Sequence, residues 1–186
     1  MRSMTVYCSS SDRLKSHFYD VAYEFGGALA QRNFALIYGG GKVGLMGRVA
    51  DGALAQGARV EGVIPGFLAS KEIAHTGLGH LHIVENMHQR KMLMANLGDA
   101  YITLPGGFGT LEELMEMLTW KQIGQHQKPI VLLNIERFWD SLIDFFDQLL
   151  DESMISLRDK QLYHISETIE DVFSYLASYA IQPDGQ

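Results

Sequence analysis

The sequence predicts an α/β protein, a Rossmann-like three-layer sandwich built on a mainly parallel sheet. Short apolar runs rich in β-branched or aromatic residues alternate with segments of helical periodicity along nearly all of the 186 residues. These runs are apolar almost throughout, which is typical of strands buried on both faces. Glycine-rich turns follow two of the runs, at the strand ends where ligands bind in such folds.

Each element follows from this alternation. Six buried strands are expected at 4–8, 34–38, 59–64, 81–84, 100–104 and 129–134. Helices are expected between and after them, at 15–31, 45–56, 87–97, 111–123, 138–150 and 168–180. The length and the 47% hydrophobic content suffice for one sizeable core, so residues 1–182 are expected to form one domain, with a tail at 183–186 that frays.

The composition narrows the class of function. A formal charge of −7 argues against a nucleic-acid polymer or an anionic membrane as the main partner, because a phosphate backbone selects for clustered Lys and Arg. Cys8 is the single cysteine, which rules out an internal disulfide and fits a reducing compartment. No apolar stretch approaches the roughly 20 residues of a membrane span. Without an HExxH motif or a Cys/His cluster, no metal site is expected. A cytoplasmic protein that binds small molecules is the expectation.

The first glycine-rich turn follows the second expected strand, in "YGGGKVGLMG" (38–47). Gly39, Gly40 and Gly41 permit close approach of a ligand, and helix N-termini with exposed amides attract phosphate. The same letters spell GxGxxG, so a dinucleotide site is an alternative. That fingerprint normally follows the first strand and needs an acidic residue at the end of the next one, whereas Glu61 lies inside its strand.

The second glycine-rich turn is "LPGGFGTLEEL" (104–114), where Pro105 ends a strand and the glycines that follow expose backbone amides. A nest of amides of this kind suits a phosphate. Thr110 and Glu113 also have the spacing of a capping box, which would explain the glutamate without any chemistry. In the functional interpretation, Glu113 instead faces a sugar or a developing cation.

The segment "ENMHQRKMLMANLGD" (85–99) predicts a helix capped by Asn86. Arg90 shares a stripe with Met87, Met94 and Leu97, so it is expected to point inward and to need an anionic partner, either a ligand phosphate or a carboxylate such as Glu113. Lys91 is expected to reach the surface by snorkelling.

Several motifs together resemble one known family. "YGGGKVGLMG" (38–47), "GVIP" (62–65), "MHQRK" (87–91), "LPGGFGTLEEL" (104–114) and "TWKQIGQHQKPIVLLN" (119–134) are similar, in order and spacing, to the LONELY GUY family of cytokinin riboside 5'-monophosphate phosphoribohydrolases. Proteins of this family often carry the description "possible lysine decarboxylase", but the sequence offers no site for the pyridoxal phosphate lysine that such chemistry requires.

The resemblance implies hydrolysis of the N-glycosidic bond of an N6-modified AMP, with water as co-substrate, no cofactor and a homodimeric assembly. It implies that Arg90 and Glu113 are catalytic. The substrate-binding residues that it implies are Glu72, Lys91, Gly106, Gly107, Phe108, Gly109, Thr110, Leu111, Glu112 and Thr119. The glycines at 39–41 would join them as part of the phosphate cradle.

Two departures from the family pattern stand out. Ser9 replaces the usual glycine after Cys8, and "IERFWDSL" (135–142) replaces a Gly-Tyr-Tyr-like segment. Two other functions stay open beside the leading one. A general AMP nucleosidase would differ only in not requiring an N6 side chain. A nucleotide-sensing module would bind without cleaving, but it would not need an inward Arg90 paired with Glu113.

Overall fold

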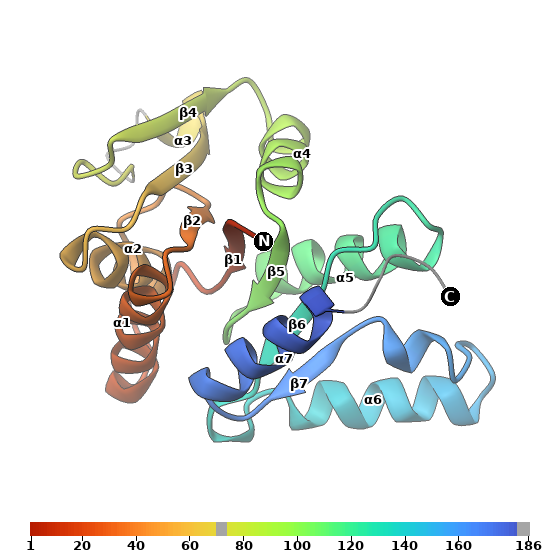
Figure 1. Ribbon diagram of the computed structural model, residues 1–186. Coiled ribbons are helices and arrows are strands. Elements are labelled where there is room, and N and C mark those ends of the chain that lie inside the picture. The colour runs from red at the N-terminus through yellow and green to blue at the C-terminus, as the bar shows by residue number, and fades with distance from the viewer. Residues whose placement is uncertain (70–73, 182–186) are drawn as a thin grey trace.

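The computed structural model describes residues 1–69 and 74–181, which form a seven-stranded sheet in the order β4-β3-β2-β1-β5-β6-β7, with every pair parallel (Figure 1). The strands are β1 (Ser3–Tyr7), β2 (Ala35–Tyr38), β3 (Val60–Pro65), β4 (His80–Val84), β5 (Ala100–Thr103), β6 (Ile130–Leu133) and β7 (His164–Ser166). The predicted α/β class with a parallel sheet is therefore confirmed.

Helices cover both faces of the sheet. They are α1 (Ser16–Gln31), α2 (Gly44–Ala55), the short α3 (Gly66–Leu68), α4 (Met87–Leu97), α5 (Phe108–Gln122), α6 (Asp140–Asp151) and α7 (Ile169–Ile181), with single 3-10 turns η2 (Ile135–Arg137) and η3 (Asp159–Gln161). One core joins α1, α2 and α7 to the sheet, and the other joins α4, α5 and part of α6. None of the helices in the described ranges combines the length and hydropathy needed to cross a bilayer.

The alternation of side chains along each strand creates these two cores. In β1, Met4 and Val6 enter the core under α1, whereas Tyr7 enters the core under α4 and α5. In β6, Val131 and Ile130 divide in the same way. Because both faces are covered, nearly every position of the central strands is buried, which explains why they read as unbroken apolar runs.

The strand order fixes where a ligand can bind. The chain moves outward from β1 through β2 and β3 to β4, and then returns to the other side of β1 with β5. The loops after β1 and β5 therefore diverge to opposite faces. A crevice between such loops, at the carboxyl ends of the strands, is the usual ligand site of open parallel sheets.

The six predicted strands and six predicted helices all form, with boundaries shifted by three residues or fewer. The seventh strand was missed because its three residues, His164 to Ser166, are too short and too polar to register as an apolar run. The start of the helix predicted at 111–123 was also wrong: α5 begins at Phe108 rather than at residue 111.

Helices α1 and α2 pack side by side through glycines (Figure 1). A Cβ on Gly26 would lie 2.1 Å from the Val49 carbonyl oxygen, and one on Gly52 would lie 2.0 Å from that of Tyr23. The two backbones therefore approach closely where neither residue has a side chain. Gly27, the next residue on α1, meets only ordinary contacts at 3.7 Å or more.

This contrast predicts opposite effects at adjacent positions. Gly26→Ala is expected to lower the free energy of unfolding by about 2 kcal/mol or more, since the added methyl forces the helices apart. Gly27→Ala is the matched control and is expected to raise it by up to about 1 kcal/mol, because Ala favours the helix interior. Urea denaturation measures both. Two variants of equal stability would contradict the close helix contact.

Candidate active site

A cavity of about 470 Å³ opens at the carboxyl ends of the strands, around the loops that leave β1, β2 and β5. Its volume lies in the range of sites for small organic molecules. Its polar boundary is formed by the Ser9–Ser11 loop, the start of α5, Arg90 and Glu113. Its apolar boundary contains Val6, Met46, Ile64, Leu68, Met87 and Met94.

The start of α5 contributes backbone amides to this cavity. Gly107 is the N-cap residue, no side chain caps this end, and Gly107, Phe108, Gly109 and Thr110 all line the cavity. The first N–H groups of a helix have no acceptor within the helix, so they are free to bind an anion. Phe108 is 93% exposed at the same place and offers a large apolar face.

The capping-box interpretation of Thr110 and Glu113 is wrong. Because α5 begins at Phe108, Thr110 is the third helical residue and Glu113 the sixth. The Thr110 side chain is buried and packs onto Gly106, where a Cβ would lie 2.1 Å from Thr110 Oγ1. Gly106 therefore makes room for the threonine, and Glu113 has no capping role.

Arg90 and Glu113 face each other across the cavity. Arg90 Nη1 lies 3.8 Å from Glu113 Oε1, and the two side chains are only 12% and 11% exposed. The rest of the guanidinium is fixed by main chain: Nε donates to the Val63 carbonyl at 3.2 Å and Nη2 to the Gly39 carbonyl at 3.3 Å. The expected inward orientation of Arg90 is confirmed, and so is the Asn86 cap, whose Oδ1 accepts from the Gln89 amide at 3.0 Å.

The protonation of Glu113 is shifted by its surroundings. Burial raises the pKa of its carboxyl to about 7, against an ordinary value of 4.5, although the Arg90 charge opposes the shift. A carboxyl group with a pKa near neutrality exchanges protons readily under physiological conditions, which suits general acid–base chemistry. The same burial raises the pKa of the Cys8 thiol well above its ordinary range, so this cysteine stays a neutral part of the wall.

The glycine loop after β2 differs from expectation. Gly39 and Gly41 line the cavity, but Gly40 packs against Ile64 and Leu81 with φ +73°. A Cβ on Gly39 would lie 1.9 Å from Arg90 Nη2, so this glycine provides space for the guanidinium. At the start of α2, the amides of Leu45 and Met46 both donate to the Ser9 carbonyl, so they are not free to hold a phosphate.

The Ser9 backbone joins the two glycine-rich loops. Its N–H donates to the Pro105 carbonyl at 3.1 Å, and its carbonyl accepts from Leu45 N at 2.9 Å. The side chains of this loop form turns, in which Ser9 Oγ accepts from Ser11 N at 3.1 Å. They do not cap α1, which begins at Ser16 after Lys15. Ser9 needs no left-handed backbone, so it replaces a glycine here without strain.

The remaining predicted residues lie elsewhere. Lys91 does not reach the cavity wall; its Nζ donates to Glu112 at 2.5 Å and to Glu116 at 3.1 Å. It is buried, not snorkelled to the surface as the sequence suggested. Leu111 packs on the core under α5, and Thr119 lies in a separate hollow farther along α5. Glu72 lies outside the described residues.

Sequence reasoning missed part of the wall. The side chains of Met46, Ile64 and Leu68 come from α2, β3 and α3. Met46 and Ile64 lie within the motifs at 38–47 and 62–65, but neither was identified there as a ligand contact. Met87 and Met94 line the same cavity, and Met94 is at the same time a buried core residue. Their seven-residue spacing around Arg90 was the available signal, because residues so spaced share one helix face.

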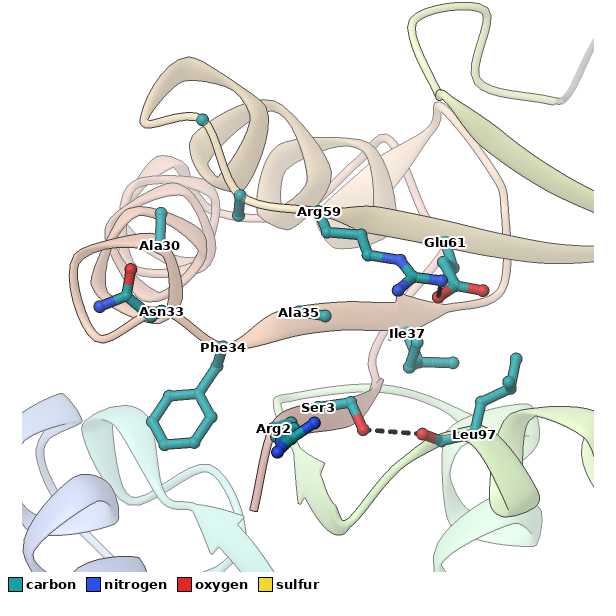
Figure 2. Close-up of a pocket in the computed structure, with 12 residues that line it drawn as sticks. Arg2, Ser3, Ala30, Asn33, Phe34, Ala35, Ile37, Arg59, Glu61 and Leu97 are labelled. Atoms are coloured by element: carbon teal, nitrogen blue, oxygen red, sulfur yellow. Dashed lines mark hydrogen bonds and ion pairs between the residues drawn. The ribbon is translucent and has the colours of Figure 1, made fainter.

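A second cavity, of about 490 Å³, lies at the opposite ends of the strands (Figure 2). Several of its polar groups are already paired within the protein. Glu61, only 5% exposed, accepts contacts at 2.8 Å from both Arg59 and His82, and Ser3 donates to the Leu97 carbonyl at 2.7 Å. Glu61 of β3 therefore forms ion pairs with Arg59 and with His82 of the neighbouring strand β4. It does not line the cavity beside the glycine loop, where a dinucleotide site would require an acidic residue.

Known proteins with similar sequences point in one direction. Residues 46–176 match the family model described as "Possible lysine decarboxylase". A cytokinin riboside 5'-monophosphate phosphoribohydrolase of Arabidopsis thaliana is 41% identical over 179 residues, covering 96% of this chain and 83% of the relative. A probable enzyme of the same name from Oryza sativa subsp. japonica is 42% identical over 183 residues, covering 98% and 73%.

Similar solved structures support the fold alone. The molybdenum cofactor carrier protein of Chlamydomonas reinhardtii superposes with a TM-score of 0.76 at 19% identity, covering 97% of this chain and 99% of that one. A molybdenum cofactor binding protein from Rippkaea orientalis gives a TM-score of 0.73 at 18% identity, covering 96% and 97%. The sheet and its helical layers are thus shared among proteins whose names indicate different ligands.

Proposed function

The chain belongs to the LONELY GUY family of cytokinin riboside 5'-monophosphate phosphoribohydrolases, and we propose on that basis that it hydrolyses the N-glycosidic bond of N6-modified adenosine 5'-monophosphates. The products are the free base and ribose 5-phosphate. The observation that carries the proposal is the buried pair of Arg90 and Glu113 beside the uncapped start of α5. A site that only binds nucleotides has no need of such a pair.

In this proposal the phosphate binds the free amides at the start of α5, with Gly107 and Gly109 allowing close approach. Glu113, five residues after Phe108, then faces the sugar. As the bond from C1' to the base nitrogen breaks, positive charge develops on the ribose, and a fixed carboxylate stabilises it. Glu113 also accepts a proton from the attacking water, whose oxygen bonds to C1'.

Arg90 serves the departing base. Its guanidinium is anchored to the carbonyls of Val63 and Gly39, on the side of the cavity that carries the apolar wall rather than at the start of α5. There its positive charge offsets the electron pair that the base takes from the broken bond. A proton from solvent then neutralises the departed base, and Glu113 returns the proton that it took from the attacking water to solvent. The apolar wall of Met46, Ile64, Leu68 and Met87 suits a purine with an apolar N6 substituent.

The geometry speaks against a lysine decarboxylase. A pyridoxal phosphate enzyme needs a lysine whose amine reaches the cofactor. Among the described residues that line the cavity there is no lysine, and the Lys91 amine is held by two glutamates. The cavity therefore does not support the activity that the family description names.

A cytoplasmic homodimer is part of the same proposal. The family resemblance assigns Thr119 to the nucleotide site, yet its hydroxyl donates to the Met115 carbonyl at 2.7 Å in a hollow separate from the cavity. In the proposed dimer, Thr119 of one copy contributes to the nucleotide site of the other copy. Sedimentation of the purified protein tests for two copies.

Base release measured by chromatography tests the activity. We expect the protein to free isopentenyladenine from N6-isopentenyl-AMP, with kcat/KM at least about tenfold higher than for AMP, since each buried methylene contributes about 0.8 kcal/mol. The unphosphorylated N6-isopentenyladenosine is the control and should react poorly. Equal rates for both monophosphates would indicate a general AMP nucleosidase. Binding without base release would indicate a nucleotide-sensing module.

A further inference from the structure

The contact between α4 and α5 concentrates five charged side chains. Glu112, Glu113 and Glu116 lie within five residues of α5, opposite Arg90 and Lys91 of α4. Arg90 approaches Glu113 at 3.8 Å, whereas Lys91 donates to Glu112 at 2.5 Å and to Glu116 at 3.1 Å. The two neighbouring cations therefore have different partners. The lysine takes the two glutamates that flank the proposed catalytic one.

Burial strengthens the pairing of Lys91 with the glutamates of α5. The Lys91 side chain is 11% exposed and that of Glu116 is 25% exposed, so their ion pair is shielded from solvent much better than a surface pair. Burial lowers the pKa of Lys91, but the hydrogen bonds that its ammonium donates to Glu112 and Glu116 outweigh this effect and raise it. Lys91 thus stays charged. Since Glu112 and Glu116 are one helical turn apart, Lys91 bridges the turn that presents Glu113.

The charges around Glu113 come from both helices. After burial, which raises its pKa, and Arg90, which lowers it, Glu112 and Glu116 raise that pKa and Lys91 lowers it. The Tyr7 hydroxyl at the end of β1 and the Cys8 thiol just after it also face this carboxyl, and both remain neutral because burial raises their own pKa values. Without Lys91, three carboxylates would face the single charge of Arg90.

We propose that Lys91 is a positioning residue for Glu113, which acts through Glu112 and Glu116 and does not bind the phosphate of the nucleotide. The proposal rests on the function proposed above for the site. By neutralising the flanking carboxylates, Lys91 keeps Glu113 available as an anion near neutral pH. By bridging them, it holds the first turns of α5 against α4, so that Glu113 and Arg90 stay aligned.

The test compares Lys91→Met and Lys91→Arg with Lys160→Met. Lys160 is a matched control, since it pairs with Asp147 outside the cavity and is only 27% exposed. We expect Lys91→Met to move the rising limb of the kcat profile about one pH unit upward and thereby to lower kcat at pH 7 about fivefold, with KM changed less than threefold. Lys91→Arg and Lys160→Met should keep the wild-type profile.

A second substitution separates charge from folding. Glu116→Gln in the Lys91→Met background removes one of the unneutralised carboxylates and should bring the limb back toward the wild-type position. A merely structural defect would lower kcat at every pH, and Glu116→Gln would not restore it. A KM raised tenfold or more, with the limb unmoved, would instead assign Lys91 to the phosphate. Either result overturns the proposal.

One measurement is independent of turnover. A titration of the glutamate carboxyls followed by carbon-13 NMR, with the Glu113 signal assigned through Glu113→Gln, gives the pKa of Glu113 directly in wild type and in Lys91→Met. An unchanged pKa would overturn the proposal even in an active enzyme. A raised pKa in a protein that releases no base would support the link between Lys91 and Glu113 while the proposed hydrolysis fails.

Discussion

Glu113→Gln is expected to lower kcat for base release by about 10²- to 10⁴-fold and, at pH 8, to give a protein more stable than wild type. The loss of activity follows from the proposed role of the carboxylate, because the amide neither accepts a proton from water nor carries the negative charge that stabilises the ribose cation. The gain in stability follows from burial. At pH 8 the wild type holds an ionised carboxylate that is only 11% exposed.

The sign of the stability effect comes from the pKa. Between the ordinary value of 4.5 and the native value of about 7, the folded state keeps a proton on Glu113 that the unfolded chain has released. Unfolding is therefore favoured progressively as the pH rises through this window, by at most roughly 3 kcal/mol, and the effect is complete above pH 7. Glutamine does not titrate, so its advantage should be absent at pH 4 and largest at pH 8.

Thermal melting of the two proteins at pH 4, 6 and 8, together with base release, checks both halves. Glu152→Gln, on an exposed glutamate, is the control and should change neither activity nor stability. An active Glu113→Gln variant would remove Glu113 from the chemistry. A variant that is inactive but less stable than wild type at pH 8 would mean that the pairing with Arg90 outweighs the cost of burial.

Arg90→Met carries the second large effect, an expected loss of about 10²- to 10³-fold in kcat, as found when one preorganised charge or donor is removed from a reacting centre. The opposite charge beside Glu113 is lost as well, so the pKa of that carboxyl should rise further and the remaining activity should increase with pH. The carbonyls of Val63 and Gly39 also lose their donor.

The division between kcat and KM identifies what Arg90 serves. If it offsets charge on the departing base, kcat falls and KM for the nucleotide changes little. A large rise in KM with kcat preserved would assign Arg90 to the phosphate. Gly39→Ala provides an intermediate variant, since the new methyl displaces the guanidinium without removing it. It should be impaired less than Arg90→Met and should melt near the wild-type temperature.

The sequence allowed most of the fold to be predicted because burial on both faces leaves an unambiguous apolar run in each central strand. β7 escaped because it is a three-residue edge strand in which only Ser166 is fully buried. The start of α5 was misplaced because Gly107 to Gly109 read as a loop, although Phe108 and Gly109 are already helical. Glycine there weakens the sequence signal for a helix and leaves the amides accessible.

The site residues that could be predicted from the sequence are those marked by a local pattern of charge and helix periodicity. Those that depend on packing between distant elements could not be predicted. Arg90 and Glu113 could be paired from helix periodicity and charge. The partners of Lys91 depend on how α4 lies against α5, and no local pattern encodes that contact. The assignment of Gly39–Gly41 to the phosphate rested on composition. In the structure, two of these three glycines serve packing: Gly39 accommodates Arg90, and Gly40 packs against β3 and β4.

At Ser9, the contact that joins the two glycine-rich loops is made by backbone groups, so it does not depend on the identity of the side chain. Both backbone groups of Ser9 are engaged, one with Pro105 and one with Leu45, while its hydroxyl bonds only within its own turn. Glycine, serine or another small residue can therefore occupy this position while the joined loops stay in place. Because Ser9 also lines the cavity, a different side chain at this position changes the wall that a ligand meets while the backbone link between the loops is kept.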